Sequence, residues 1–491
     1  MIKISDSFKT DDKKLAALYE SARSALVGAI KPFGAYNLAV ISSESDKMTL
    51  ASEIMSAETY ARYDVATSME CVRVIEMTQR EDGQLACEII KNQDEIYGNY
   101  WGLSGFCFVE EALSLFYMTK KKEKEYLDLI YRMFSKFDDY IWGTHDYNKN
   151  GLPELISEKE TVEGAVSARY APLTVKEDGK VREISLFPIE TGLMAAFAYR
   201  LKMALCEISL LVKDGRAEIY YDEAQRLREN IKANLWVEEN SACFDRDYRG
   251  SIINSLSLDN LFMMYYGALD KDMADAFVKN HLLDPEEFYT NLPLPNFPIK
   301  SPEFSNDAHH RYGGQVRGVT YRRAIRALEK YGYYTLLTDV SKRFIDAVSD
   351  SMAFTEQYDP FTGAPSREKI CADYAPTASA ILEIIARFYG VSVVFDDVVW
   401  GALGHEGECS SEYNFKWGGD TYTLSAEKLT STGSINGSLL FTITNGARVI
   451  TDWFGDNPRV VNIADKTFDC VFVYRNQTFS FTIEPGEIKE F

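Results

Sequence analysis

Leu193-Met-Ala-Ala-Phe-Ala-Tyr-Arg-Leu201 begins a stretch that runs to Val212 and is apolar on nearly every side of a helix. Residues 105–117 are of the same kind. Residues 123–142 and 335–350 share the 3.6-residue period, but their apolar side chains form one stripe opposite polar residues. A helix that is apolar all round must be covered on every side, whereas a striped helix faces water. The two kinds alternate from residue 11 to residue 390 without the fixed-period repeat of a solenoid. This alternation predicts two concentric rings of helices.

Two long segments between helices indicate where a binding site is built. Residues 143–188 and 283–315 are rich in Gly, Pro, Asn and charged residues, and they are too long to be simple connections. In a double ring of helices such insertions gather at one end. We therefore expect the functional residues to lie on these loops.

The sequence period changes after Gly390. Residues 413–417, 439–444, 448–453, 468–473 and 479–483 alternate or run apolar at the length of strands. Asn445-Gly446, between two of these runs, is a strong hairpin signal. We expect residues 1–392 to form a mainly α catalytic domain and residues 393–491 a small antiparallel, sandwich-like β domain packed on it.

Composition and charge narrow the class of protein. The 491 residues include 53 basic and 74 acidic side chains, a net charge of −21, so nucleic acid is an improbable partner. The eight cysteines form no CxxC pair and the five histidines no HxH or HxxxH pair, so we expect no metal and no cofactor. The first residues lack an apolar signal core and no long apolar run follows. These features predict a cytoplasmic protein without a membrane partner, and a homo-oligomer stays open.

One loop has the features of a catalytic site. Glu356-Gln-Tyr-Asp-Pro-Phe-Thr-Gly363 presents a carboxylate, an aromatic ring two residues later and a Pro…Gly turn that doubles back. A carboxylate held on a rigid loop beside an aromatic ring is suited to act as a general base against a sugar ring.

Further segments lie at or just before expected helix starts, the end at which an inner ring would present residues to a common mouth. They are Ala61-Arg-Tyr-Asp64, Asn99-Tyr-Trp-Gly102, His145-Asp-Tyr-Asn-Lys-Asn-Gly-Leu-Pro-Glu154 with Glu160–Tyr170, and Arg311-Tyr-Gly-Gly-Gln-Val-Arg317.

The order and spacing of these segments resemble the inverting glycoside hydrolase clan of trehalases, processing α-glucosidases and mannosylglycerate hydrolases (family 63-like). That clan has a Trp-Asp helix start, an Asp-Gly-Asn-Gly-Leu-Pro-Glu loop, a Tyr-Trp-Arg-Gly-Pro-Val-Trp segment and a Glu-x-Tyr-x-Pro-x-Thr-Gly loop. The matching segments here are Tyr63-Asp64, Asn148–Glu154, Arg311–Arg317 and Glu356–Gly363. The resemblance covers residues 55–390 and implies an (α/α)6 barrel.

The sequence departs from the clan at the position of the catalytic acid. The clan pattern Gly-Trp-Asp-Asn-Ser-Pro-Arg, anchored on Arg169, puts Ala165 where the acidic Asp belongs. The acid could instead be Glu163, our preferred assignment, or less favourably Glu160, either of them reaching from a shifted loop. Alternatively, Ala165 is a substitution made to trap a substrate, or catalysis is lost.

A second departure is Arg317, which stands where the clan has Trp. A guanidinium in this place indicates a substrate that carries an acidic group, or else an ion pair with a neighbouring acid of the protein. The sequence leaves both interpretations open.

The resemblance also implies roles for individual residues. Glu356 would be the general base, Asp64 would bind sugar hydroxyls, and Tyr100 with Trp101 would give a stacking surface. From the residues alone, Asp64 could instead cap a helix, and the two aromatic rings could pack in a core. The implied substrate-binding residues are Tyr63, Asp64, Tyr100, Trp101, Arg169, Gln315, Arg317 and Tyr358.

Together these observations predict an inverting, exo-acting glycoside hydrolase for a small α-linked saccharide or glycoside. A glycoside phosphorylase is the first alternative, with Gly313-Gly314, Arg311 and Arg317 as its candidate phosphate cradle. A catalytically inactive sugar-binding homologue is the second, because Ala165 replaces the acid.

Overall fold

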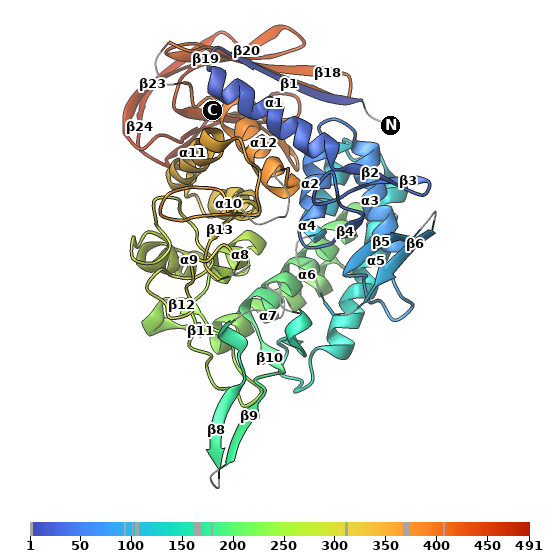
Figure 1. The fold of residues 1–491 in the computed structure, drawn as a ribbon. Coiled ribbons are helices and arrows are strands. Elements are labelled where there is room, and N and C mark those ends of the chain that lie inside the picture. The colour runs from blue at the N-terminus through green and yellow to red at the C-terminus, as the bar shows by residue number, and fades with distance from the viewer. Residues whose placement is uncertain are drawn as a thin grey trace.

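The computed structural model describes residues 3–92, 95–100, 102–103, 108–160, 168–177, 180–309, 313–366, 373–405 and 408–491. A helical body occupies most of the chain, and strands make up its C-terminal part (Figure 1). The mainly α fold with a C-terminal sheet domain is therefore confirmed. None of the helices in these residues combines the length and the apolar character needed to cross a membrane.

The even-numbered helices form an inner ring. In the described part of the chain α2 contacts α4, and contacts continue through α6, α8 and α10 to α12, which returns to α2. The bounds are α2 (Glu53–Tyr60), α4 (Phe108–Met118), α6 (Gly192–Val212), α8 (Asp259–Tyr266), α10 (Gly318–Lys330) and α12 (Ala375–Tyr389). The stretches that are apolar all round become α4 and α6, whose residues are buried on nearly every side.

The odd-numbered helices pack outside this ring. They are α1 (Lys13–Gly28), α3 (Val65–Met77), α5 (Lys124–Thr144), α7 (Ala217–Asn234), α9 (Lys271–Phe277) and α11 (Tyr334–Ser351). α1 packs on α12, α3 on α2, α5 and α7 on α6, and α11 on α10. The striped outer helices are buried on one side, as in α7, where the buried residues are Ala224, Leu227 and Ile231. The striped stretches at 123–142 and 335–350 are thus the outer helices α5 and α11.

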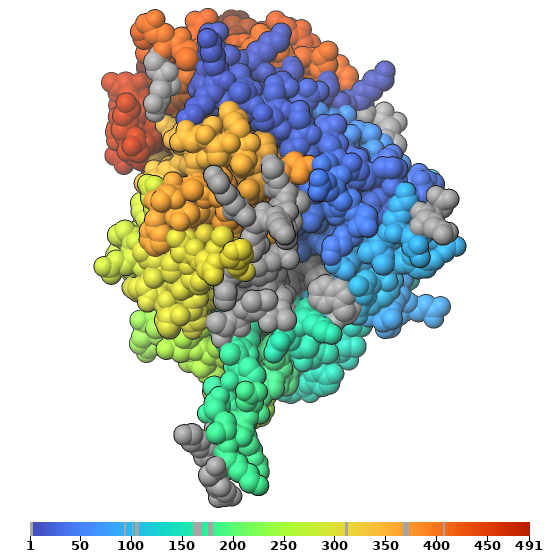
Figure 2. Space-filling view, viewed as in Figure 1, coloured from blue at the N-terminus to red at the C-terminus, as the bar shows by residue number. Residues whose placement is uncertain are grey.

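Short strands and helical turns occupy the connections between helices. They are β2 (Ile30–Phe33), β3 (Tyr36–Ala39), β4 (Lys47–Thr49), β5 (Glu88–Asn92), β6 (Glu95–Asn99), β7 (Glu154–Leu155), β8 (Leu173–Glu177), β9 (Lys180–Ile184), β10 (Ile189–Glu190), β11 (Trp236–Val237), β12 (Ala242–Cys243), β13 (Val316–Arg317) and β14 (Gln357–Tyr358), with turns at Glu158–Glu160, Ala168–Tyr170, Glu238–Asn240 and Val278–Leu282. The hairpin of β8 and β9 projects from the body (Figure 2).

The C-terminal domain consists of two antiparallel sheets. The larger has the order β1-β17-β18-β19-β20-β23-β24 and the smaller β15-β16-β21-β22-β25. The strands are β1 (Ile4–Thr10), β15 (Val391–Val394), β16 (Asp397–Trp400), β17 (Ser411–Trp417), β18 (Asp420–Ala426), β19 (Thr430–Ile435), β20 (Ser438–Thr444), β21 (Ala447–Asp452), β22 (Arg459–Asn462), β23 (Phe468–Tyr474), β24 (Gln477–Ile483) and β25 (Ile488–Glu490). Residues 4–10, which we assigned to the first domain, are an edge strand of the larger sheet.

The hairpin predicted at Asn445-Gly446 is wrong. β20 and β21 flank this turn but lie in different sheets, so the chain crosses from one sheet to the other here. The Asn445 side-chain amide donates to the carbonyl of Glu427 at 2.6 Å, and the Gly446 amide donates to the carbonyl of Ala402 at 2.9 Å. Gly446 has a φ of +95°, which suits glycine. The turn itself is present, but the strands that it joins do not pair.

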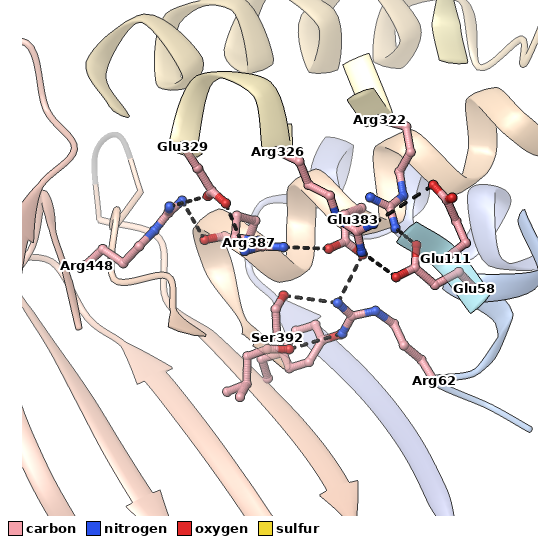
Figure 3. Close-up of polar contacts among 12 residues, drawn as sticks. Glu58, Arg62, Glu111, Arg322, Arg326, Glu329, Glu383, Arg387, Ser392 and Arg448 are labelled. Atoms are coloured by element: carbon pink, nitrogen blue, oxygen red, sulfur yellow. Dashed lines mark hydrogen bonds and ion pairs between the residues drawn. The ribbon is translucent and has the colours of Figure 1, made fainter. Parts of the chain in front are cut away.

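Buried ion pairs cross the inside of the ring (Figure 3). Glu58 on α2 accepts from Arg322 and Arg326 on α10. On α12, burial alone would raise the pKa of Glu383, but Arg322, Arg62 and Arg387 outweigh it and hold this pKa well below its usual range. A buried carboxylate with several arginine partners is compensated, whereas removal of one partner leaves an unpaired buried charge.

The same chain of ion pairs reaches the β domain. Glu329, near the end of α10, lies 3.0 Å from Arg387 and 2.5 Å from Arg448 of β21. Arg62, which follows α2, donates to the carbonyl of Val391 at 3.1 Å and to the Ser392 hydroxyl at 3.0 Å. The β domain is therefore fastened to the ends of the inner helices at which α2 and α10 finish.

Glu58→Gln should lower the free energy of unfolding by about 3–5 kcal/mol, because Arg322 and Arg326 would stay buried without their shared counter-charge. The midpoint of thermal or denaturant unfolding measures this loss. Lys428→Gln, which breaks the exposed pair with Glu408, should leave the midpoint nearly unchanged. An unchanged midpoint in Glu58→Gln would contradict the view that these pairs hold the ring together.

Candidate functional site

The inner helices begin at a common end of the ring. Asp245 joins the starts of α6 and α8. It accepts from the amide of Gly192, the first residue of α6, at 3.0 Å, and it lies 3.3 Å from Arg169, which pairs with Asp259, the first residue of α8. Met55, in the first turn of α2, packs on Val319, in the first turn of α10. The long loops at 145–191, 235–258, 283–317 and 352–374 all lead into these starts. This end, opposite the β domain, is the candidate site.

Glu356 and Arg317 form an ion pair at the start of α10. Arg317 Nη2 lies 3.2 Å from Glu356 Oε1, and both side chains are about nine-tenths buried, with exposed fractions of 10% for Glu356 and 12% for Arg317. β13 pairs with β14 so that Arg317 is opposite Gln357, and the Gly318 amide donates to the Glu356 carbonyl at 3.1 Å. The backbone ladder and the guanidinium together fix the position of the Glu356 carboxylate.

A glycine allows this arrangement. A Cβ at Gly318 would lie 2.0 Å from the Thr377 hydroxyl on α12, which is far inside contact distance. The Thr377 hydroxyl donates to the carbonyl of Thr355 at 2.7 Å, one residue before Glu356. The starts of α10 and α12 therefore approach closely around the loop that carries the carboxylate.

Tyr358 and Gln315 support the loops of the site. Tyr358 is fully buried, packs edge-on against Phe344 at 5.8 Å and donates its hydroxyl to the Ala353 carbonyl at 2.6 Å. The Gln315 amide donates to the Asn306 carbonyl at 3.2 Å. Both side chains are bonded within the protein, where they hold the loops of the site.

Arg169 is the centre of a second buried cluster. Arg169 Nη2 lies 2.5 Å from Asp259 Oδ2, and Nη1 donates to the Ser257 hydroxyl at 2.5 Å. Tyr170 donates its hydroxyl to Asp245 at 2.6 Å, and burial raises the pKa of Asp245 although Arg169 acts in the opposite direction. Arg169 therefore lies at the candidate end, where it joins the starts of α6 and α8.

The loop before the expected acid is held by buried side chains. Glu160 Oε2 accepts from the Ile156 amide at 2.6 Å, and Oε1 lies 3.3 Å from His145 Nε2. Glu190 accepts from the side-chain amides of Asn148 at 2.8 Å and Asn150 at 2.6 Å. Both oxygens of Glu160 are thus used within the loop, which disfavours Glu160 as the acid.

Tyr63 and Asp64 lie at the other end of the ring. They follow the C-terminus of α2, and their neighbour Arg62 binds the β domain. Asp64 caps α3 by accepting from the Ala66 amide at 2.9 Å and from the Thr67 hydroxyl at 2.8 Å. Tyr63 packs near Tyr60 at 6.0 Å. We therefore withdraw both residues from the site, because the length of the ring separates them from Glu356.

Of the remaining implied residues, the structure describes Tyr100 alone. The Tyr100 hydroxyl donates to the carbonyl of Thr78, and the Arg80 guanidinium covers its ring at 4.3 Å. Trp101, Glu163 and Ala165 lie outside the described residues.

The structure adds residues that the sequence analysis missed. Arg323 lies on α10 inside the ring, 4.6 Å above the ring of Phe262 on α8, and donates to the Ala51 carbonyl at 3.4 Å. With Met55 and Val319, these side chains lie near the start of α10, which follows Arg317. Two adjacent arginines, Arg322 and Arg323, in an otherwise buried helix are the signal in the sequence that could have identified Arg323. Such a pair, however, usually lies on a helix face that is exposed to water.

Comparison with known proteins identifies the family. The family model described as the mannosylglycerate hydrolase MGH1-like glycoside hydrolase domain matches residues 110–375, more than half of the 491 residues. The chain belongs to this glycoside hydrolase family. The match begins in α4 and ends at the first residue of α12, so it includes the Arg169 cluster and the loop of Glu356.

Solved structures of glycosidases share the fold. A GH63 mannosylglycerate hydrolase from Thermus thermophilus, in complex with glucose, has a TM-score of 0.61 and 15% identity and covers 75% of this chain and 99% of its own. A sialidase has a TM-score of 0.69 and 13% identity over 91% of this chain and 41% of its own. A GH78 rhamnosidase of Bacillus has a TM-score of 0.60 and 15% identity over 87% of this chain and 40% of its own. At these identities the likeness concerns the fold.

Arg317→Leu should lower the turnover of neutral and anionic glycosides by the same factor, because the guanidinium holds Glu356 rather than a charge on the substrate. The loss of one charged hydrogen bond is about 1.5–3 kcal/mol, or roughly ten- to a hundredfold. Steady-state rates on matched neutral and acidic aryl glycosides measure the two factors. A loss confined to the acidic substrates would restore Arg317 as an anion-binding residue.

Proposed function

We propose that this protein is an inverting, exo-acting glycoside hydrolase that cleaves a small α-linked saccharide or glycoside. We further propose that the closed ring of inner helices with its outer layer is an (α/α)6 barrel. The observation that carries the functional proposal is the fixed position of Glu356 at the mouth of the ring. Family membership supports the reaction class, and the geometry supports the residue.

Glu356 has the properties that a general base requires. Its carboxylate is nearly buried, and it is oriented by Arg317 and by a backbone ladder. In the proposed reaction Glu356 takes a proton from water as the water oxygen attacks the anomeric carbon on the face opposite the leaving group. Inversion needs a separation of about 6.5–9.5 Å between the two carboxyl groups to leave room for that water.

We propose Glu163 as the acid that protonates the leaving oxygen. The clan position is occupied by Ala165, and Glu160 binds Ile156 and His145 within its own loop. Glu163 is the other glutamate of residues 160–170. An acid that was lost or replaced at Ala165 stays the alternative.

The part of the substrate that leaves with the glycosidic oxygen, the aglycone, is either acidic or neutral. Mannosylglycerate hydrolases share the fold, and the glycerate in the name of that enzyme is an acidic group. In this chain, however, Arg317 pairs with Glu356. We therefore propose a neutral α-glycoside as the first substrate class to test, with an acidic glycoside as the second.

The alternative functions have weaker support. A phosphorylase would need a cation for phosphate. Of the two arginines of the suggested cradle, Arg317 is paired with Glu356 and Arg311 lies outside the described residues. A Cβ at Gly314, another part of that cradle, would lie 2.5 Å from the Phe304 ring, which gives this glycine a packing role. An inactive sugar-binding homologue rests on Ala165 alone. Product formation with and without phosphate separates these alternatives from hydrolysis.

Glu356→Gln should reduce hydrolysis by at least about 10²–10⁴-fold, because the amide is isosteric but cannot accept the proton. Arg317 would lose its buried counter-charge, so the midpoint of thermal unfolding should fall as well, and the rates are measured below that midpoint. A screen of aryl α-glycosides and α-linked disaccharides gives the rates. Glu408→Gln, an exposed glutamate of the β domain, is the control and should keep full activity. Near wild-type turnover in Glu356→Gln would show that another group is the base.

Ala165→Asp and Glu163→Gln together identify the acid. If Glu163 is the acid, Glu163→Gln should abolish the cleavage of sugar leaving groups but spare glycosyl fluorides, whose departure needs no proton. Ala165→Asp should then gain little, because two neighbouring carboxyls raise each other's pKa. A large gain in Ala165→Asp together with an active Glu163→Gln would refute our assignment.

A further inference from the structure

An open groove of about 520 Å³ lies on the outer wall, where the loop after α5 meets α7. It is formed by α5, α6, α7 and the loop after α5, and it faces away from the inside of the ring. Its volume is within the range of small-molecule sites. The lining residues are Asp138, Asp139, Trp142, Gly151, Lys202, Glu223, Arg226, Leu227 and Asn230.

The floor of this groove is a charged triad, of which Asp138 and Lys202 are buried and Glu223 is partly exposed. Lys202 Nζ lies 2.6 Å from Asp138 Oδ2 and 2.6 Å from Glu223 Oε2. Asp138 and Lys202 are only 5% and 6% exposed, so both are held by the fold. An ammonium group has three donors, and the contacts of Lys202 in the described structure use two of them on carboxylates. The third donor is available to a hydroxyl in the groove.

Trp142 forms one wall in a fixed orientation. Its indole nitrogen donates to Asp138 Oδ1 at 3.1 Å, and Lys202 Nζ lies 5.8 Å from its ring centroid. The side chain is half-buried. A tryptophan whose polar edge is tied to the protein presents the rest of its ring as a rigid apolar surface.

The rim of the groove is polar, and the backbone of the loop after α5 lies close to α7 there. Asn230 on α7 donates to the carbonyls of Asn150 and Gly151, each at 3.3 Å. A Cβ at Gly151 would lie 2.8 Å from the Asn230 amide, so the loop approaches α7 as closely as it does because this residue is glycine. Arg226 and Asp139 are exposed beside the opening.

We propose that this groove is a second binding site, for a neutral pyranose. The apolar C–H face of a sugar ring would lie on Trp142, and its hydroxyls would bond Lys202, Glu223 and Arg226. The acidic side chains Asp138, Asp139 and Glu223 nearly balance Lys202 and Arg226, so the groove selects neither an anion nor a cation. An apolar ligand would leave these polar groups without partners. The proposal does not depend on hydrolysis at Glu356.

The chain offers a direct probe, because it has only six tryptophans. In protein labelled with ¹⁵N-tryptophan, the Trp142 indole signal is assigned by its loss in Trp142→Leu. Titration with methyl α-glucoside, methyl α-mannoside and methyl α-galactoside should shift this signal saturably with at least one of them. We expect a dissociation constant on the order of 1 mM. The Trp236 indole, which is bound to Glu238, should not move.

Two arginine variants give the matched comparison. Arg226→Ala should weaken the titration of the Trp142 signal by about three- to tenfold, the effect of one lost hydrogen bond. Arg132→Ala, an exposed arginine of α5 outside the groove, should leave it unchanged. Trp142→Leu should retain hydrolysis, which separates this site from Glu356. No saturable shift of Trp142 with any of the three glycosides, or equal effects of the two arginine variants, would overturn the proposal.

Discussion

The buried pairing of Glu58 with Arg322 and Arg326 is the interaction on which the arrangement of the inner ring depends. It joins α2 to α10 across the inside of the ring, where neither charge could remain unpaired. α10 makes structural contacts along its whole length. Its first turn follows Arg317, its middle carries the buried arginines, and Glu329 near its end binds Arg387 and Arg448. One helix thus connects the candidate site, the inside of the ring and the β domain.

This arrangement has a consequence for the chemistry that we propose. Glu356 is positioned by Arg317, which immediately precedes α10. Because ion pairs hold α10 at its middle and its end, they also fix the position of the Glu356 carboxylate. General base catalysis benefits from such fixation, because the carboxylate must stay within hydrogen-bond distance of the attacking water. The same pairing explains why Arg317 stands where the clan has Trp, without requiring an acidic group on the substrate.

Sequence periodicity predicted the layers of the fold because the apolar pattern of a helix reports what surrounds it. α4 and α6 were recognised as enclosed helices, and α5 and α11 as outer ones. Periodicity does not tell at which end of the ring a residue lies. A carboxylate just before an inner helix and one just before an outer helix have the same sequence pattern, although they lie at opposite ends of the ring. The resemblance to the clan placed Asp64 in the site, whereas the structure shows that it caps α3 near the β domain. An ion pair of Arg317 with a neighbouring acid was one of two open interpretations, and the contact with Glu356 favours it. Asn445-Gly446 shows the same limit, since turn chemistry does not specify which strands pair.

The configuration of the sugar first released from an α-glycoside tests the central claim most directly. Proton NMR recorded within the first minutes of reaction distinguishes the anomers before they equilibrate. Water activated by Glu356 would attack opposite the leaving group, so the account predicts that the β-anomer appears first. Initial release of the α-anomer would mean a covalent intermediate and a nucleophilic carboxylate, and it would contradict the role that we assign to Glu356.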